Sequence, residues 1–262
     1  MTAPIDRFRE LHAAGCFVIP NPWDVGSARL LEQLGFPALA TTSSGYAWST
    51  GRRDNQINLD DALAHFRAIS DAVAVPVNGD FEGGFAAAPE EVAANFAKAA
   101  TTGVAGLSIE DSTVNGGEPL FDFSLAVERV RAAREGASGV LLTGRCEAFL
   151  VGRPDLDETI RRLTAYSEAG ADCLYAPGLR KLDDIRAVVA AVAPKPVNVL
   201  VSSDFTNVAE MASLGVRRIS VGGALARAAW GGFLAAATEI AEQGTFTALM
   251  KGVPFAELNA KF

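Results

Sequence analysis

The sequence predicts a (β/α)8 barrel, in which eight parallel strands alternate with helices along a single chain. Eight short, mostly apolar runs recur along the 262 residues, and each is followed by a longer segment rich in alanine, leucine, glutamate and arginine. The repeat of about 20–37 residues suits one barrel of about 250 residues. No linker or low-complexity segment divides the chain, so we expect a single domain over residues 1–262.

The runs have the length of buried strands, and most are continuously apolar, as expected of strands covered on both faces. Helical patterns lie between them: one begins with Pro89 followed by two glutamates, which suits the first turn of a helix. Several of these patterns end in a glycine directly before the next strand, as a helix C-cap would. The strands are expected at 16–20, 38–43, 75–81, 106–111, 139–145, 172–177, 196–201 and 217–223.

Residues 244–262 remain after the eighth unit, and we expect them to form one or two additional helices as a C-terminal extension. An open doubly wound sheet is the alternative architecture. That fold would need a glycine-rich GxGxxG turn after its first strand, and the chain reads "PNPWDVGSA" there.

Composition limits the classes of function. The net charge of −8, with no basic stripe, argues against nucleic-acid and membrane partners. No run approaches the roughly 20 apolar residues of a membrane helix, and the charged N-terminus lacks the apolar core of a signal peptide, so we expect a cytoplasmic protein. Cys16, Cys146 and Cys173 are odd in number and widely spaced, which predicts buried free thiols rather than disulfides or a zinc site.

Acidic residues collect at predicted strand ends, where barrels of this type carry their active sites. Asp80 and Glu82 lie at the end of the third strand, and Glu110 and Asp111 lie at the end of the fourth. Asp54 lies in the loop after the second strand and could join them. Because alternate residues of a strand face the same side, we expect Asp80 and Glu82 to point together and Glu110 and Asp111 to point apart.

Several carboxylates that converge on one barrel mouth repel one another unless a cation neutralises them. An oxygen-only set favours Mg²⁺, or Mn²⁺, over zinc. The two histidines, His12 and His65, lie away from the strand ends, which argues against a histidine-bound metal. The alternative is that the acids cap helices or lie in solvated loops.

Arg145 ends the fifth predicted strand, and two interpretations of it stay open. It forms an ion pair with one of the acids, or it binds a substrate carboxylate bidentately. "TTSSGY" (41–46) could offer backbone N–H groups around Gly45 to an anion, or it is a polar turn. Cys146 faces away from Arg145 and is expected to pack. No lysine lies at a strand end, which argues against a Schiff-base aldolase.

These motifs resemble the isocitrate lyase/phosphoenolpyruvate mutase superfamily along nearly the whole chain. Two of the matching stretches, "VNGDFEGGF" and "GLSIEDS", are the most specific, because the family builds its metal site on strand ends of this form. Gly84-Phe85 departs slightly from the Gly-Tyr that is common there. The matching stretches are "NPWDVGSARLLEQLGFPALATTSSGYA", "VNGDFEGGF", "GLSIEDS", "GRCEAF", "PVNVL" and "GVRRISVGGAL".

The resemblance implies a (β/α)8 barrel whose final helix is exchanged between the subunits of a homodimer or homotetramer. It implies Mg²⁺ near Asp80, with the other acids acting directly or through waters, and Arg145, Asp54 and Glu110 as candidate catalytic residues. The implied metal residues are Asp80, Glu82, Glu110 and Asp54. The implied substrate-binding residues are Trp23, Ser43, Ser44, Gly45, Tyr46, Asp80, Arg145 and Asn198.

The loop after the fourth strand departs from the lyases of that superfamily. Isocitrate and methylisocitrate lyases carry a K-K-C-G-H motif there, whereas this chain reads "STVNGGEPLFDF" (112–123), without cysteine, lysine or histidine. Those two activities are therefore not expected. Ser112, Asn115 and Glu118 are the candidate polar residues of this lid loop, with Glu118 as a candidate proton donor.

The resemblance and the acids together predict a Mg²⁺-dependent lyase. It would cleave a C–C bond of a small 2-oxo or 2-hydroxy carboxylic acid through a metal-stabilised enolate, as an oxaloacetate decarboxylase does. The alternatives are a C–P bond enzyme, namely phosphonopyruvate hydrolase or phosphoenolpyruvate mutase, and a non-catalytic 2-oxo acid binding protein. A metal-independent phosphosugar barrel, based on "SVGGAL" before a helix, is a further alternative.

Overall fold

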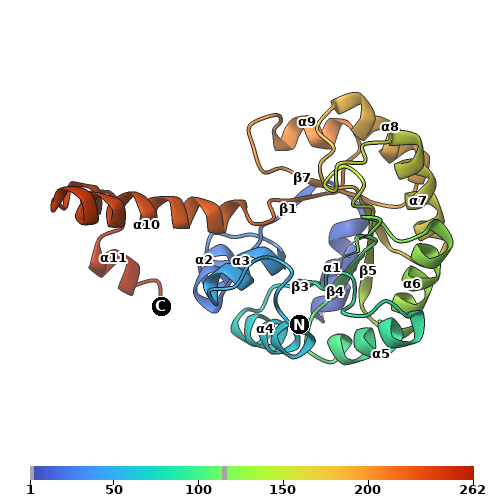
Figure 1. The fold of residues 1–262 in the computed structure, drawn as a ribbon, viewed down its shortest axis with the longest axis horizontal. Coiled ribbons are helices and arrows are strands. Elements are labelled where there is room, and N and C mark those ends of the chain that lie inside the picture. Colours follow the sequence, from blue (N-terminus) through green and yellow to red (C-terminus); the bar gives the residue numbers. More distant parts are fainter. Residues whose placement is uncertain (1–2, 114–116) are drawn as a thin grey trace.

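A computed structural model describes residues 3–113 and 117–262, and Figure 1 shows their arrangement. Eight strands run parallel in the order β1-β8-β7-β6-β5-β4-β3-β2. At the remaining seam, the backbone N–H of Ala40 donates to Pro20 O at 3.0 Å, which nearly closes the barrel. The strands are β1 (Phe17–Ile19), β2 (Leu39–Ala40), β3 (Val77–Asp80), β4 (Gly106–Glu110), β5 (Leu141–Arg145), β6 (Cys173–Tyr175), β7 (Val197–Leu200) and β8 (Arg218–Ser220).

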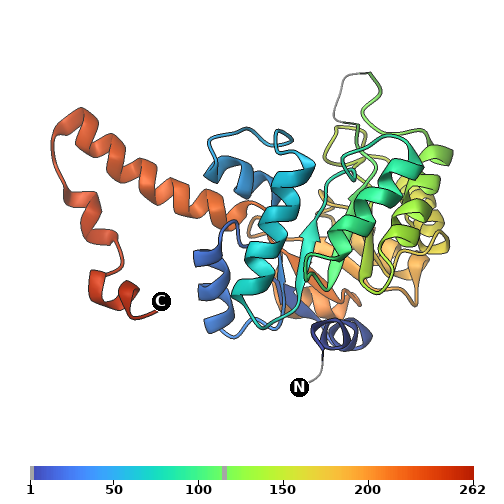
Figure 2. The same ribbon diagram turned by 90° about the horizontal axis from the view of Figure 1, so that it is seen from below.

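Helices follow the strands around the outside of the barrel (Figures 1 and 2). The predicted (β/α)8 fold is therefore confirmed, and every predicted strand overlaps an observed one. The helices are α1 (Pro4–Ala13), α2 (Val25–Gln33), α3 (Ser43–Ser49), α4 (Leu59–Ala72), α5 (Pro89–Ala100), α6 (Phe123–Gly136), α7 (Leu156–Glu168), α8 (Leu182–Val192), α9 (Val208–Ser213), α10 (Ala224–Gln243) and α11 (Phe255–Asn259), with the 3₁₀ helix η1 (Thr247–Lys251).

Side-chain caps fix where several of these helices begin. Asp24 accepts from Ser27 N at 2.7 Å at the start of α2, and Asn58 accepts from Asp61 N at 2.9 Å at the start of α4. Such caps satisfy backbone N–H groups that have no partner within the helix.

The stretch 41–46 differs from its prediction as a turn or loop. Thr42 accepts from Gly45 N at 3.3 Å and caps the short helix α3, which begins at Ser43. The N–H groups expected to form an open anion nest are therefore partly used, since Ser43 N donates to Asp80 Oδ2 at 3.1 Å.

The main core lies between the strands and the surrounding helices. Phe66 of α4, Phe81 after β3 and Phe96 of α5 are buried and form aromatic contacts, with ring centroids 5.8 Å and 4.9 Å apart. Gly79 of β3 faces this layer, where an added Cβ would lie 2.8 Å from the Phe66 ring. The neighbouring residues of β3, Asn78 and Asp80, therefore face the barrel axis.

The side chains in the middle of the barrel interior differ from those in most (β/α)8 barrels, whose interiors are filled mainly by bulky branched residues. Besides Ile19 and Leu200, which line the cavity, small or polar residues face the axis at this level, so the strands leave space below the mouth. They are Ala40, Asn78, Ser108, Thr143, Asn198 and Ser220.

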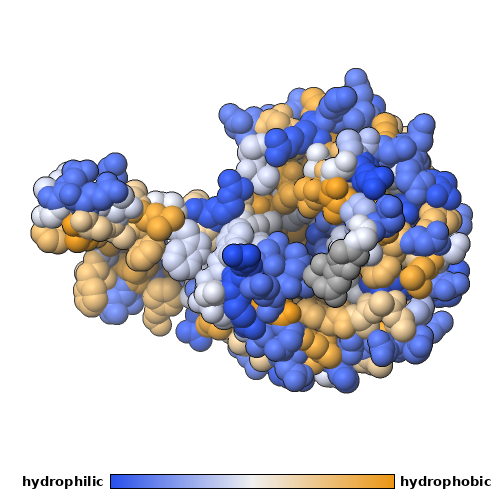
Figure 3. All heavy atoms as spheres, in the orientation of Figure 1, coloured by the Kyte–Doolittle hydropathy of each residue, from blue (hydrophilic) through white to orange (hydrophobic). Residues whose placement is uncertain are grey.

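The last helices leave the barrel as an arm, defined here as residues 224–262. α10 projects away from the barrel, and η1 and α11 fold back beside it (Figures 1 and 2). The extension was expected to begin at residue 244, whereas the chain already leaves the barrel with α10. Apolar side chains gather on the arm (Figure 3), and Phe233 and Phe255 are 58% and 84% exposed. Within the described ranges, no helix combines the length and the apolar character needed to cross a membrane.

Candidate active site

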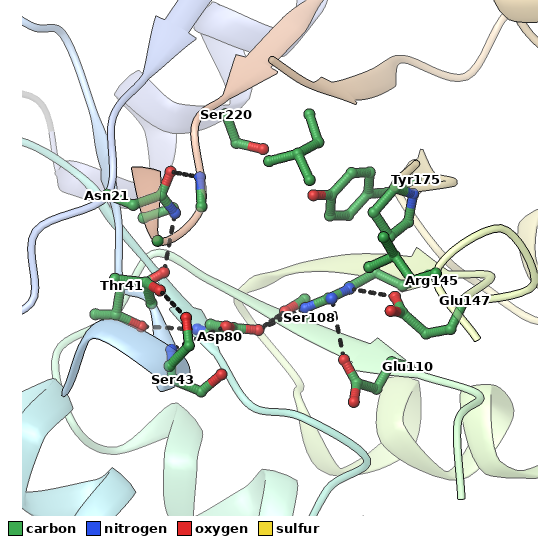
Figure 4. Close-up of a pocket in the computed structure, with 18 of the residues that line it drawn as sticks. Asn21, Thr41, Ser43, Asp80, Ser108, Glu110, Arg145, Glu147, Tyr175 and Ser220 are labelled. Carbon is green, nitrogen blue, oxygen red and sulfur yellow. Dashed lines mark hydrogen bonds and ion pairs between the residues drawn. The ribbon is translucent and has the colours of Figure 1, made fainter. Parts of the chain in front are cut away.

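A cavity of about 800 Å³ opens at the carboxyl ends of the strands and reaches into the polar interior of the barrel. Side chains from the ends of all eight strands, or from the loops that follow them, line it (Figure 4). They include the predicted site residues Ser43, Ser44, Asp54, Asp80, Glu110, Ser112, Arg145 and Asn198.

Arg145 is the centre of the site. Its guanidinium donates from NH1 to Asp80 Oδ1 at 2.6 Å, and its NH2 lies 3.1 Å from Glu110 Oε2. Its Nε donates to Glu147 Oε1 at 2.9 Å, so three carboxylates surround one cation (Figure 4). Tyr175 also lies beside it, with the guanidinium carbon 5.1 Å from the ring centroid. The ion-pair interpretation of Arg145 is therefore confirmed, and it involves three acids where the sequence suggested one.

The second strand and its loop fix the orientation of Asp80. Asp80 N donates to Thr41 Oγ1 at 2.9 Å, and Asp80 Oδ2 accepts from Ser43 N at 3.1 Å. Ser108 Oγ lies 3.4 Å from the other carboxylate oxygen. The side chain of Asp80 is thus held at the barrel axis by three neighbouring elements.

Glu110 and Asp111 point to opposite sides of the sheet, as predicted. Glu110 faces the cavity, where Ser112 Oγ donates to its Oε1 at 2.9 Å. Asp111 faces α7, where its Oδ2 accepts from Tyr166 OH at 2.6 Å and from Arg162 NH1 at 3.2 Å. Only Glu110 of this pair belongs to the site.

Asp111 nevertheless affects the site through the backbone. Its Oδ1 accepts from Glu147 N at 2.8 Å, so a buried ion-pair network behind β5 holds the residue that contacts Arg145. The network is almost completely buried, with Asp111 3% exposed.

Glu82 does not continue the strand, which corrects the expectation that it would point together with Asp80. β3 ends at Asp80, and Glu82 has a φ of +47°. The alternation of strand side chains therefore stops before it, and Glu82 lies outside the cavity lining. It is buried, and its Oε1 has no hydrogen-bond partner in the described structure.

Burial and mutual repulsion alter the acidity of these groups. Burial, followed by the charges of Asp80 and Glu110, raises the pKa of Glu82 to about 8. Burial also raises the pKa of Glu147 to about 8 against the opposing effect of Arg145. It raises the pKa of Glu110 in the same way. Protons are therefore available in this cluster near neutral pH.

Asp54 reaches the cavity from the loop after α3. Burial and then the charge of Asp80 raise its pKa. Arg145 has the opposite behaviour: burial alone would lower its pKa, but the surrounding carboxylates, Glu147 foremost, raise it well above the ordinary value. The surrounding carboxylates therefore favour the charged form of Arg145.

Three residues expected to bind substrate lie outside the cavity lining. Tyr46 stacks on His65, with ring centroids 4.0 Å apart, and Gly45 is buried against Trp23. An added Cβ at Gly45 would lie 3.0 Å from Trp23 Cβ and 2.7 Å from Thr42 Cγ2. The formation of α3 explains the position of Tyr46, because the helix turns this side chain toward α4 and leaves Ser43 and Ser44 at the cavity.

The lid loop contributes two described residues to the cavity, Ser112 and Thr113. Glu118 is exposed and pairs with Arg153 at 3.1 Å, so the expected proton donor faces solvent. Asn115 lies outside the described residues. A backbone bridge between Ser112 and Leu120 brings the two ends of the loop together.

The structure adds residues that the sequence reasoning did not select. Glu147, two residues after Arg145, could have been found by asking which acid shares its face. Ser108 and Arg218 lie before the ends of their strands, and Tyr175 lies before the end of the predicted strand 172–177, so none of the three was at a predicted strand end. Asn21 accepts from Val221 N and Gly222 N at 2.9 and 2.8 Å, which joins β1 to the loop after β8.

The donor chemistry suits a hard divalent cation, because every acidic group here offers oxygen. The buried, unpartnered oxygen of Glu82 is a further ligand candidate, directly or through water. Among the described residues, however, no three or more acids, histidines or cysteines are arranged as a metal-binding group, because Arg145 lies between them. Metal binding would require Arg145 to give up at least one of its carboxylates.

Fold and site together define a (β/α)8 barrel protein with an acidic cavity at the carboxyl ends of its strands. The model of the phosphoenolpyruvate phosphomutase family matches residues 8–241, and the chain belongs to that family, within the isocitrate lyase/phosphoenolpyruvate mutase superfamily. The resemblance seen in the sequence is therefore confirmed. This superfamily contains C–C and C–P bond-cleaving enzymes.

Individual relatives show the same relationship. A lyase/mutase-type crystal structure from Burkholderia cenocepacia J2315 is 49% identical with a TM-score of 0.95, over 98% of this chain and 95% of that one. An oxaloacetate decarboxylase of Bradyrhizobium diazoefficiens is 32% identical over 69% of this chain and 65% of its own length. A phosphonopyruvate hydrolase crystallised with oxalate and Mg²⁺ shares the fold, with 23% identity and a TM-score of 0.87 over 99% of this chain and 95% of that one.

Proposed function

We propose that this chain is a Mg²⁺-dependent lyase that cleaves a C–C bond of a small 2-oxo or 2-hydroxy carboxylic acid, in the manner of an oxaloacetate decarboxylase. The observation that carries the proposal is the buried Arg145 in contact with Asp80, Glu110 and Glu147 at the mouth of the barrel. This arrangement offers one anion-binding cation and a set of oxygen ligands within a single cavity. The similarity to an oxaloacetate decarboxylase supports the choice of bond.

Arg145 would bind the substrate carboxylate. Its guanidinium presents planar paired donors, and the polar surface formed by Ser43 and Ser44 lies in the same cavity. Since Asp80 Oδ1 and Glu110 Oε2 occupy the NH1 and NH2 groups, binding exchanges protein carboxylates for the carboxylate of the ligand. Such an exchange keeps the cation paired throughout, which avoids the cost of a buried unpaired charge.

Asp80, with Asp54, Glu82 and Glu110, would hold Mg²⁺ or Mn²⁺. The ion would supply Lewis-acid stabilisation of the negative charge that develops on the substrate when the C–C bond breaks. Release of Asp80 and Glu110 from Arg145 would supply these oxygens. Arg145, Asp54 and Glu110 are the proposed catalytic residues.

A panel of 2-oxo and 2-hydroxy acids, including oxaloacetate, tests the proposal in the presence of Mg²⁺. Carbon NMR should show the loss of a C–C bond in at least one acid, and chelation of the metal should stop the reaction. Turnover that persists without a divalent metal, or a panel with no turnover and no binding, would contradict the proposal.

A C–P bond enzyme is the second candidate, supported by the family model of a phosphomutase and by the lid loop without the K-K-C-G-H motif. It would use the same cavity and differ in the lid. Phosphorus NMR on phosphonopyruvate separates the two reactions. Ligand-dependent stabilisation without any product would instead support a non-catalytic 2-oxo acid binding protein.

We also propose that the protein is a cytoplasmic homodimer or homotetramer in which the arm of one chain packs on another. The exposed Phe233, Leu234 and Phe255 support this, because so much apolar surface is costly in water. The three free cysteines suit a reducing compartment. Sedimentation of the chain and of a Phe233→Asp variant tests the assembly: the variant should shift toward the monomer, and a wild-type monomer would contradict it.

A further inference from the structure

A buried arginine of α6, Arg129, binds the loop that follows β3, defined here as the β3 loop (residues 81–87). Arg129 is 1% exposed, and NH1 of its guanidinium donates to Ala86 O at 2.5 Å and to Ala87 O at 2.8 Å. Its NH2 donates to Gly83 O at 2.5 Å, and an added Cβ at Gly83 would lie 3.2 Å from this NH2. One guanidinium therefore fixes three carbonyl oxygens of a single loop.

The backbone of the β3 loop adopts conformations that need such support. Glu82 and Phe85 have φ values of +47° and +56°, and Gly84 between them has a φ of +75°. Residues with a side chain rarely adopt this left-handed region, and they keep it only where their surroundings fix the backbone. Arg129 supplies that constraint, because it binds carbonyl oxygens within this stretch and directly after it.

Phe121, near the C-terminal end of the lid loop, packs against the same guanidinium. The guanidinium carbon of Arg129 lies 3.9 Å from the centroid of the Phe121 ring, which is a favourable contact for a cation. Phe121 is itself held by its backbone, because its N–H donates to Asp111 O at 2.9 Å and its carbonyl accepts from Arg162 NH1 at 3.1 Å. The contact with Phe121 therefore limits where the guanidinium can lie.

The β3 loop places Glu82 among the acids of the site. Glu82 is 6% exposed, its Oε1 has no hydrogen-bond partner in the described structure, and its carbonyl accepts from Glu110 N at 3.1 Å. Burial, and then the charges of Asp80 and Glu110, raise the pKa of Glu82, which places its carboxyl close to theirs. Because these carboxylates repel one another when no cation is bound, the loop needs an anchor that keeps Glu82 in place.

We propose that Arg129 is a positioning residue for the metal site: by binding the carbonyls of the β3 loop, it keeps the carboxylate of Glu82 where it serves a divalent cation, directly or through water. This inference rests on the proposed function, because it assumes that a divalent cation binds beside Asp80. Arg129 lies outside the cavity lining, so it acts through the backbone and touches neither metal nor substrate.

Mg²⁺ binding by variants of Arg129 and Glu82 tests this role. Calorimetry should show at least about tenfold weaker Mg²⁺ binding in Arg129→Met, because the freed loop can turn Glu82 away from the site. Glu82→Gln should lose at least as much affinity. The double variant should lose no more than Glu82→Gln alone, since a residue that acts only through Glu82 has no further effect once Glu82 is changed.

Arg129→Lys keeps the test decisive if Arg129→Met does not fold. It retains a buried cation, but a single ammonium cannot reproduce the paired donors of the guanidinium. We expect Arg129→Lys to bind Mg²⁺ with an affinity between those of the unchanged protein and Glu82→Gln, and to add nothing to the loss caused by Glu82→Gln.

Arg134→Met is the matched control on the same helix. Arg134 also donates to backbone carbonyl oxygens, those of Ala137 and Val140, but these residues precede β5 at the amino ends of the strands. The control should lose stability and keep its Mg²⁺ affinity.

Three results would overturn the positioning role alone. They are an unchanged Mg²⁺ affinity in the folded variants of Arg129, losses that add in their double variants with Glu82→Gln, and an equal loss in Arg134→Met. An unchanged protein that binds no Mg²⁺ overturns the proposed function and the positioning role with it.

Discussion

Arg145 NH1 lies 2.6 Å from Asp80 Oδ1, so the cation expected to bind the substrate contacts the acid expected to bind the metal. Their side chains are 13% and 18% exposed, which limits screening by water. Because Glu110 and Glu147 also contact Arg145, the guanidinium neutralises a cluster that would otherwise repel itself. Under the proposed function, metal and substrate binding would require Arg145 to release at least one of these carboxylates.

Arg145→Met should strongly destabilise the metal-free protein. It removes the one cation from three buried carboxylates, and breaking a buried pair in this way costs on the order of 3–5 kcal/mol of unfolding free energy. Urea denaturation in a chelator measures the loss. Arg153→Met, at an exposed surface pair with Glu118, is the matched control and should change stability by less than about 1 kcal/mol. Equal effects of the two variants would show that the cluster does not depend on Arg145.

Glu82→Gln should flatten the pH dependence of stability. Burial first, and then Asp80, raise the folded-state pKa of Glu82 to about 8 from its ordinary value of 4.5. The folded state then binds more protons than the unfolded state, so stability falls as the pH rises from about 4.5 to 8, by up to about 1.4 kcal/mol per pH unit.

Urea denaturation of the metal-free protein at several pH values between about 5 and 8 measures this pH dependence of the unfolding free energy. The glutamine variant should lose stability less steeply over that range and be the more stable protein at the alkaline end. Glu168→Gln, at an exposed position in the last turn of α7, serves as the control and should leave the slope unchanged. An unchanged slope in Glu82→Gln would mean that Glu82 titrates normally.

Asp111→Ala should damage the site although Asp111 faces away from it. The change removes the acceptor of Glu147 N and leaves Arg162 without its buried carboxylate partner. We expect a loss of about 3 kcal/mol in unfolding free energy, together with weaker ligand binding. Tyr166→Phe removes one hydrogen bond to the same carboxylate and should cost about 1 kcal/mol. Denaturation and calorimetry of both variants test this, and an Asp111→Ala protein of unchanged stability would contradict the role of the network.

The sequence was sufficient for the fold because the signal is repeated. Each apolar run and each glycine-ended helix pattern occurs several times, so an error in one unit changes nothing in the others. The opposite directions of Glu110 and Asp111 also followed from strand alternation alone, because β4 continues to Glu110.

The same rule failed for Glu82, since a backbone φ of +47° after the strand depends on packing that the sequence does not display. Likewise, the helix α3 turned Tyr46 onto His65 and away from the cavity, where a loop was expected. Arg218 carries no motif, and its contacts with Asn198 and Thr143 form only when β5, β7 and β8 are brought together. Contacts between strands that are far apart in the sequence are therefore the part of the site that could not be predicted from it.

Asp80→Ala tests the central claim most directly. The experiment measures divalent-metal binding by calorimetry, and the turnover of the acid found in the panel, in the unchanged protein and in the variant. The account predicts that the unchanged protein binds Mg²⁺ and turns over a 2-oxo or 2-hydroxy acid, and that Asp80→Ala loses both while remaining folded. Turnover by Asp80→Ala in the absence of metal would contradict it.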